Sequence, residues 1–261
     1  MTHLPVLKTL LSLVILIIGV GTVEARDRGE ALIRQAHQRI IPQHETRQID
    51  IFMMEGNRVT NQRQMEIKFL VDGGVEKTLA VFTAPASIAG NALLLNDAGR
   101  GENQIWSYSP TDRRVRRISG QLRRNYFMGT EFAYEDFEGF RIGSRAYTYI
   151  EDRSCGNARC HVIDGIETDR NILASTGYSK RRYFLDTRSL YPVIIEYYTR
   201  EGRHCKTLRS SQVRSVGAYL IAGEQHMINH CAGRSTRFVV TSVDNQTPIN
   251  PNAVSRHALG R

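Results

Sequence analysis

Two adjacent carboxylates, Glu135 and Asp136, are the residues in this chain that could form a general acid–base pair. Such a pair needs positioned partners, and none of the motifs that would supply them is present. The sequence contains no G-x-S-x-G turn, no H-E-x-x-H helix and, after residue 25, no glycine-rich phosphate loop. We therefore predict that the protein is not an enzyme, with a secreted hydrolase acting through Glu135 and Asp136 as an alternative.

The four cysteines could form disulfides or, with nearby histidines, a zinc site. Cys155 and Cys160 flank a four-residue turn, and Cys205 and Cys231 would face each other in a hairpin centred near residue 218. Facing residues of antiparallel strands lie close enough for a disulfide, so we expect both local pairs. The zinc alternative lacks the usual ligand spacing, and we expect no metal and no cofactor. Its candidate ligands are His204, Cys205, His226, His230 and Cys231.

Basic residues are in excess, with 35 Lys and Arg against 26 Asp and Glu, which gives a net charge of +9. Such a charge favours an anionic partner: nucleic acid, a membrane surface or an acidic ligand. Six arginines fall within residues 113–124. A solvated charged face is the simplest interpretation of such a cluster. The candidates for a basic rim that contacts headgroups or a partner are Arg113, Arg114, Arg116 and Arg117.

Residues 126–140 contain six of the chain's 21 aromatic residues. This composition predicts a loop or short helix that packs its rings onto or into a sheet. Four carboxylates in the segment could pair with the arginines that precede it, and these are Glu131, Glu135, Asp136 and Glu138. The candidates for a gate or cavity plug are Tyr126, Phe127, Met128, Phe132, Tyr134 and Phe137.

Residues 1–25 have the pattern of a cleaved secretory signal: Lys8, an apolar stretch over residues 10–20, and a small-residue cleavage site ending at Ala25. An uncleaved anchor is the alternative, but the apolar stretch is shorter than a membrane-spanning helix requires. Export fits the expected disulfides. It also removes nucleic acid from the expected partners and leaves anionic lipid or a membrane surface.

The elements that must position these residues are mostly strands. A short amphipathic helix is predicted over residues 27–40, ended by Pro42. From residue 45 onward apolar and polar residues alternate in about a dozen short runs separated by turn signals. This pattern predicts an antiparallel sheet or barrel and excludes an α/β fold. A barrel of this size would hold an apolar cavity or a plug, whereas a sandwich would have a filled core.

Several motifs resemble the LolA-like family of outer membrane lipoprotein-sorting proteins, in the branch found beside resistance-nodulation-division exporters. The match extends from about Met65 to Val243, and RVRRI with FMGTEF is its most specific part. The matching motifs are QIWSYSP (104–110), RRVRRIS (113–119), FMGTEF (127–132), YED (134–136), CHVI (160–163), YSKRRYFLD (178–186), YPVIIEYY (191–198) and GRHCKTL (202–208).

The resemblance implies a mainly β fold: one large curved antiparallel sheet forming an incomplete barrel, with helices or a loop in its concave face. It divides the chain into a signal peptide (1–25), the half-barrel domain (26–245) and a flexible tail (246–261). The implied function is a monomeric periplasmic carrier that binds lipid or lipoprotein acyl chains for transfer toward the outer membrane. The alternative is a lipid-sensing adaptor that docks onto an inner-membrane exporter or a signalling protein. Peripheral membrane contact fits both.

Overall fold

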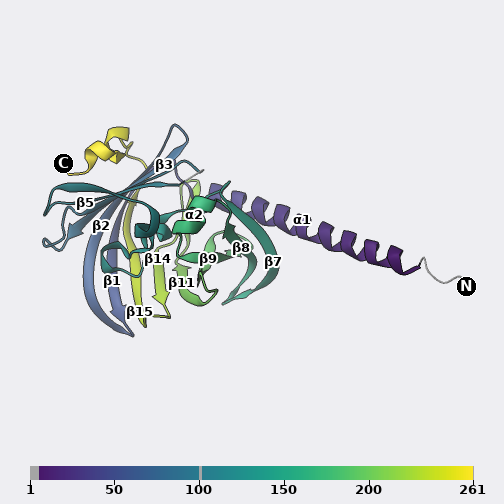
Figure 1. Cartoon of the computed structure of the whole chain (residues 1–261). Helices are drawn as coiled ribbons and strands as arrows, with labels where there is room; N and C mark the ends of the chain where they lie inside the picture. The colour runs from purple at the N-terminus through teal and green to yellow at the C-terminus, as the bar shows by residue number, and fades with distance from the viewer. Residues whose placement is uncertain (1–5, 100–101, 261) are drawn as a thin grey trace, which may run out of the picture.

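The alternating segments form one antiparallel sheet of thirteen strands that curves strongly around a concave face (Figure 1). The computed structural model describes residues 6–99 and 102–260, with side chains from residue 23 onward. The strand order is β6-β5-β4-β3-β2-β1-β15-β14-β11-β10-β9-β8-β7. The sheet does not close, because β6 and β7 remain as its two edge strands. The predicted incomplete barrel is therefore confirmed, and the sandwich alternative is wrong.

Most neighbouring strands in the sheet are also neighbours in the sequence, as expected for a meander of hairpins. The strands are β1 (His44–Glu55), β2 (Arg58–Asp72), β3 (Val75–Ala84), β4 (Ala92–Asp97), β5 (Gln104–Ser109), β6 (Arg114–Ile118), β7 (Arg145–Cys155), β8 (Ala158–Glu167), β9 (Tyr178–Asp186), β10 (Pro192–Thr199), β11 (His204–Ser211), β12 (Arg214–Val216), β13 (Tyr219–Ile221), β14 (Glu224–Asn229) and β15 (Arg234–Asp244). The helices are α1 (Val6–Ile40) and α2 (Arg170–Ser175), with short 3-10 turns η1 (Gly120–Arg124), η2 (Phe127–Gly129), η3 (Tyr134–Phe137), η4 (Pro251–Val254) and η5 (Arg256–Ala258).

Alternation along each strand separates two apolar faces. In β4, Leu93 and Leu95 point into the concave core, and Leu94 points into a smaller cluster on the outer face. The concave core also receives Ile51 and Met65, both fully buried. The period-two pattern thus predicts not only the strands but also which of their residues face inward.

Helix α1 occupies the concave face beside β7 and extends away from the sheet toward its N-terminus (Figure 1). Ile33 and Ala36 of its apolar stripe are fully buried. Gly29 lets the helix approach the strand closely, because a Cβ at this position would lie 2.6 Å from the backbone nitrogen of Tyr149. The predicted end of the helix at residue 40 is confirmed, and the helix begins earlier than residue 27.

The predicted signal peptide lies mostly outside the residues whose side chains are described, which begin at Val23. Among the helices of the described part, none combines the length and the hydropathy needed to span a bilayer. Cleavage after Ala25 therefore stays a prediction.

The hairpin that carries the second cysteine pair is offset by one residue from its predicted register. Lys206 faces Asn229 across β11 and β14, which places Cys205 opposite His230 rather than Cys231. The hairpin is also broken beyond this pairing: β11 ends at Ser211, β14 begins at Glu224, and the distal part of the hairpin forms the separate β12–β13 ribbon. A Cβ at Gly223 would clash with side chains of the facing strand, so the break needs a glycine here.

The C-terminal segment packs against the outer face of the sheet instead of forming the flexible tail that we expected. Val254 is fully buried, and Leu259 is 8% exposed. Both contact outer-face residues of β3 and β4, including Leu79 and Leu94. The physical reason is that the outer face of these strands is itself apolar, and the tail supplies the residues that cover it.

Candidate functional site

The link between β6 and β7 crosses the concave face and fills part of it. We call residues 126–140 of this link the plug. Its rings stack against the sheet: the centroids of Phe132 and Phe238 are 4.3 Å apart, and those of Phe127 and Phe82 are 5.3 Å apart. Phe127 and Phe137 meet edge to face at 5.2 Å. The aromatic segment therefore packs into the sheet, as its composition predicts.

Each of the four plug carboxylates forms an ion pair inside the protein. Three of the four partners lie outside the arginines of residues 113–124 that we considered. Of that cluster, within the described residues, Arg123 alone pairs with a plug carboxylate. Arg124 donates instead to the backbone carbonyls of Ala174 and Ser175, and the other four lie on or beside the edge strand β6. The pairs are Glu131–Arg234, Glu135–Arg181, Asp136–Lys206 and Glu138–Arg123.

Asp136 is held by three donors from separate parts of the chain. The Tyr178 hydroxyl donates at 2.8 Å, the Lys206 ammonium at 3.1 Å and the Ala133 amide at 2.7 Å. Burial, with the nearby Asp136 charge adding to it, raises the pKa of Tyr178, so this hydroxyl keeps its proton and remains a donor. Asp136 thus joins the plug to β9 and β11.

Glu135 is fixed in the same manner, on the other side of the plug. It accepts hydrogen bonds from the Thr176 hydroxyl at 2.6 Å, the Gly177 amide at 2.8 Å and Arg181 at 3.3 Å. Its side chain is 2% exposed. Both carboxylates of the candidate acid–base pair, Glu135 and Asp136, are thus bound by partners that anchor the plug.

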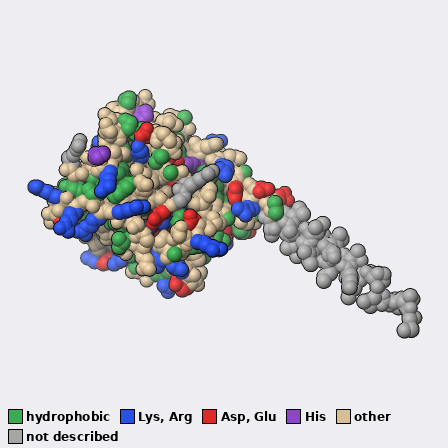
Figure 2. Space-filling model, turned by 45° about the horizontal axis from the view of Figure 1, so that its top comes forward, with side chains coloured by type: hydrophobic (Ala, Val, Ile, Leu, Met, Phe, Trp, Pro, Cys, Tyr) green, Lys and Arg blue, Asp and Glu red, His purple; other side chains and the backbone are tan. Residues whose placement is uncertain are grey.

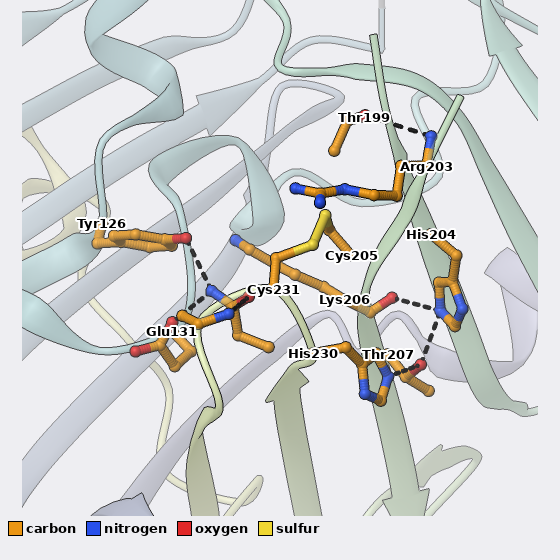
Figure 3. Close-up of a disulfide and its surroundings, with 12 residues drawn as sticks. Tyr126, Glu131, Thr199, Arg203, His204, Cys205, Lys206, Thr207, His230 and Cys231 are labelled. Carbon is orange, nitrogen blue, oxygen red and sulfur yellow. Dashed lines mark hydrogen bonds between the residues drawn. A yellow bond between two sulfur atoms is a disulfide. The ribbon is translucent and has the colours of Figure 1, made fainter. Parts of the chain in front are cut away.

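The second disulfide joins the start of β11 to the residues that follow β14, next to these anchors (Figure 3). Cys205 and Cys231 are joined with their Cα atoms 5.2 Å apart, and Asn229 lies just before Cys231. The Asn229 amide donates to the Tyr126 hydroxyl at 2.8 Å and to Glu131 at 2.7 Å. The disulfide therefore holds a strand end that binds two plug residues.

Lys206, the neighbour of Cys205, binds the plug from the opposing strand. Its side chain extends toward Tyr126 in Figure 3, with the ammonium 4.6 Å from the ring centroid. This cation–π contact adds to its ion pair with Asp136. The two strands that the disulfide joins thus provide both a cation and an amide to the plug.

The other disulfide confirms the predicted cysteine pairing, and the histidine contacts argue against the zinc alternative. Cys155 and Cys160 are joined across the β7–β8 turn. Both cysteines of the zinc alternative are oxidised and cannot act as ligands. His204 and His230 instead meet the Thr207 hydroxyl, each at 2.9 Å. The described residues contain no cluster of three potential ligands.

Between the plug and the concave face lies a cavity of about 260 Å³. Plug residues from 132 to 140 cover it, and the sheet forms its floor. Most of its surface is apolar, and its charged lining residues are two arginines, Arg47 and Arg181, and two carboxylates, Asp136 and Glu138. The apolar part of the lining consists mainly of Ile40, Ile49, Ile67, Phe132, Phe137, Phe140, Pro192, Ile195, Leu208, Ala222, Phe238 and Val240.

The candidate rim arginines divide between the two faces of β6. Arg114 and Arg116 face the concave side, because they lie four and two residues before the buried Ile118 on the same strand and so share its face. Arg117 faces outward opposite Trp106, and Arg113 lies in the turn before the strand. Figure 2 shows Lys and Arg side chains gathered at the end of the molecule away from α1, where β5 lies in Figure 1.

The plug anchors on β9 and β11 could not be selected from the sequence. Arg181 and Lys206 lie far from the plug along the chain and belong to strands of mixed composition. The available signal was a charged residue at an inward position. Arg181 shares a strand face with Tyr183, and Lys206 shares one with Leu208; Tyr183 and Leu208 are both buried. A buried charge at such a position needs a partner of opposite sign.

These features define a class of protein: an open antiparallel half-barrel with a helix and an aromatic plug in its concave face. A family model described as an uncharacterized protein matches residues 74–261. The fold is similar to that of an outer membrane lipoprotein-sorting protein domain from Vibrio parahaemolyticus. That structure has 28% identity and a TM-score of 0.84, with 90% of this chain and 100% of that chain covered. The chain therefore belongs to the family that this model describes, and it shares the fold of the lipoprotein-sorting protein domain.

Two further solved structures share the fold at lower identity. A DUF1329 family protein from Desulfovibrio piger has 19% identity and a TM-score of 0.83, covering 90% of this chain and 99% of that one. A LolA superfamily protein from Nitrosomonas europaea has 17% identity and a TM-score of 0.68, covering 88% and 99%. No curated protein matches the chain in sequence.

Proposed function

We propose that this protein is a periplasmic carrier that binds the acyl chains of a lipid or lipoprotein between the plug and the sheet. The observation that carries the proposal is the apolar cavity of about 260 Å³ beneath the plug. The similarity to a domain described as lipoprotein-sorting supports it. The predicted signal peptide and the two disulfides support a periplasmic location, and we propose that the transfer runs toward the outer membrane.

The size of the cavity assigns a role to the plug. Ligand pockets for small molecules usually measure about 300–1,000 Å³, so a long acyl chain needs more room than this cavity offers. Movement of the plug would provide it, which makes Tyr126, Phe127, Met128, Phe132, Tyr134 and Phe137 the gate. Each buried methylene contributes about 0.8 kcal/mol, so a chain of twelve offers about 10 kcal/mol against the contacts that the plug gives up.

The test is uptake of a fluorescent fatty acid by delipidated protein. Ile195 lines the cavity, and its replacement by Trp should lower affinity about tenfold or more by filling the space. Ile194→Trp is the matched control, because Ile194 packs on the outer face of the same strand. Absence of uptake by the delipidated wild-type protein, with far-UV circular dichroism showing it folded, would refute the proposal.

The adaptor alternative makes a different prediction for Arg113, Arg114, Arg116 and Arg117. If they dock onto a membrane protein, reversing their charge should remove that protein from a pull-down with solubilised membranes and leave fatty acid uptake intact. If the carrier proposal is correct, purification from periplasm followed by native mass spectrometry should reveal bound lipid.

A further inference from the structure

A second pocket, of about 180 Å³, lies between the β4–β6 edge of the sheet and the plug. Two cross-strand pairs form its sheet side: Arg114 faces Ser109, and Arg116 faces Ser107. Side chains two positions apart on one strand project from the same face about 7 Å apart. The pocket therefore presents two guanidinium groups and two hydroxyl groups on one small surface.

The charge in this pocket is positive. Asp112 is the one acid in its lining, and it already binds Arg116 at 2.5 Å and the Ser109 hydroxyl. Arg114 forms no ion pair within the described part of the chain. The positive charge of Arg114 is therefore available to an anionic ligand in the pocket.

The plug forms the opposite wall through Phe127, Met128 and Tyr134. Burial raises the pKa of Tyr134, so its hydroxyl remains a donor near neutral pH. Phe127 contacts Phe137, which lines the acyl cavity. An anion in this pocket would therefore touch the same aromatic cluster that covers the cavity.

We propose that the pocket formed by Arg114 and Arg116 binds the phosphate group of an acyl lipid, an inference that rests on the proposed carrier function. The planar, forked guanidinium group matches phosphate oxygens in bidentate geometry. The volume corresponds to about six water molecules at about 30 Å³ each, which suits a headgroup and excludes an acyl chain. The substrate class is then phosphate-bearing lipid, with the chain beneath the plug and the phosphate beside it.

The experiment compares two double variants that each remove two positive charges from the same stretch of chain. Arg114→Gln with Arg116→Gln changes the pocket. Arg113→Gln with Arg117→Gln is the matched control, because neither residue lines it. Binding to fluorescent phosphatidic acid should fall about tenfold or more in the first variant, since hydrogen bonds to charged groups are strong, and about twofold or less in the control.

Fluorescent diacylglycerol with the same chains lacks the phosphate, so its binding should be equal in all three proteins. An equal loss of phosphatidic acid binding in both double variants would overturn the proposal, because general charge attraction would explain it. Unchanged binding in Arg114→Gln/Arg116→Gln would also overturn it while leaving the carrier function intact.

A further arm separates the lipid headgroup from free phosphate. Inorganic phosphate and glycerol 3-phosphate are titrated calorimetrically into the wild-type protein. Binding as tight as that of phosphatidic acid would assign the pocket to soluble phosphates and overturn the lipid assignment. Weaker binding that still requires Arg114 and Arg116 is the expected result. If neither fluorescent lipid binds, the carrier function fails, and the lipid assignment fails with it.

Discussion

Removal of the Cys205–Cys231 disulfide should weaken both the whole fold and the plug. The bond closes a loop of 26 residues, whereas Cys155–Cys160 closes one of 5. In the chain-entropy model a closure of the first kind contributes about 3.5 kcal/mol and one of the second kind about 2 kcal/mol. Replacing Cys205 and Cys231 with Ala should therefore lower the free energy of unfolding by about 1.5 kcal/mol more than replacing Cys155 and Cys160.

The plug distinguishes this disulfide from its control in a second measurement. Lys206 and Asn229, which bind the plug, lie one and two residues from the two cysteines (Figure 3). Amide hydrogen exchange of residues 126–138, followed by mass spectrometry, should accelerate about tenfold or more in the Cys205→Ala/Cys231→Ala variant. It should stay near the wild-type rate in Cys155→Ala/Cys160→Ala, because that disulfide lies in the β7–β8 turn away from the plug.

Urea unfolding at neutral pH gives the two free energies, and both variants keep the other disulfide as an internal standard. Equal losses of stability in the two variants would refute the loop-length reasoning. Equal exchange rates in residues 126–138 would refute the claim that the β11–β14 disulfide supports the plug anchors, even if the stability difference were as expected.

Three other substitutions test separate parts of the structure. Burial, together with the nearby charge of Asp97, raises the pKa of Glu76 from 4.5 to about 7. The stability that the protonated Glu76 carboxyl contributes is therefore fully present below pH 4.5 and is lost as the pH rises through 7. This loss lowers the free energy of unfolding at pH 8, relative to pH 4, by at most about 3 kcal/mol. In Glu76→Gln that part of the pH dependence should be absent when urea unfolding is measured at the two pH values. Gly29→Ala should destabilise by about 1–3 kcal/mol, since α1 must move away from β7, and an unchanged Tm would contradict the close packing. Glu135→Gln should cost about 3–5 kcal/mol by leaving the buried Arg181 without its anion, and a neutral effect in thermal unfolding would show that the pair does not anchor the plug.

The strands and their faces were predictable because alternation is a local signal. Leu93, Leu94 and Leu95 of β4 belong to a run whose burial on both sides can be read from its composition. The disulfide pairs were predictable for a similar reason, since each joins nearby strands. The one-residue error at Cys231 arose because the hairpin turns between Gly217 and Ala218, with Val216 facing Tyr219, and is not centred on residue 218; the pairs of β11 with β14 keep the same register.

The plug contacts were not predictable, because they depend on which distant strands the curvature of the sheet brings opposite the plug. The local arginines of residues 113–124 looked like suitable partners for Glu135 and Asp136. In the folded chain most of them lie at an edge of the sheet, while Arg181 and Lys206 from the other half occupy the concave face. The packing of Val254 against the outer face was likewise not predictable, because the sequence does not show which segment covers that face.

If the protein acts as the proposed carrier, the position of the plug in the topology would allow the cavity to enlarge without breaking the sheet. In a closed barrel every strand is hydrogen-bonded on both sides, so widening the interior requires the rupture of a strand ladder. Here the sheet ends at β6 and β7, and the segment that connects these two edges is the one that carries the plug. Its attachments are ring contacts and side-chain pairs such as Asp136–Lys206 rather than ladder hydrogen bonds. Under the proposed carrier function, a ligand would therefore displace the plug by replacing apolar contacts and a few ion pairs, while the thirteen-stranded sheet would keep the backbone hydrogen bonds that define it.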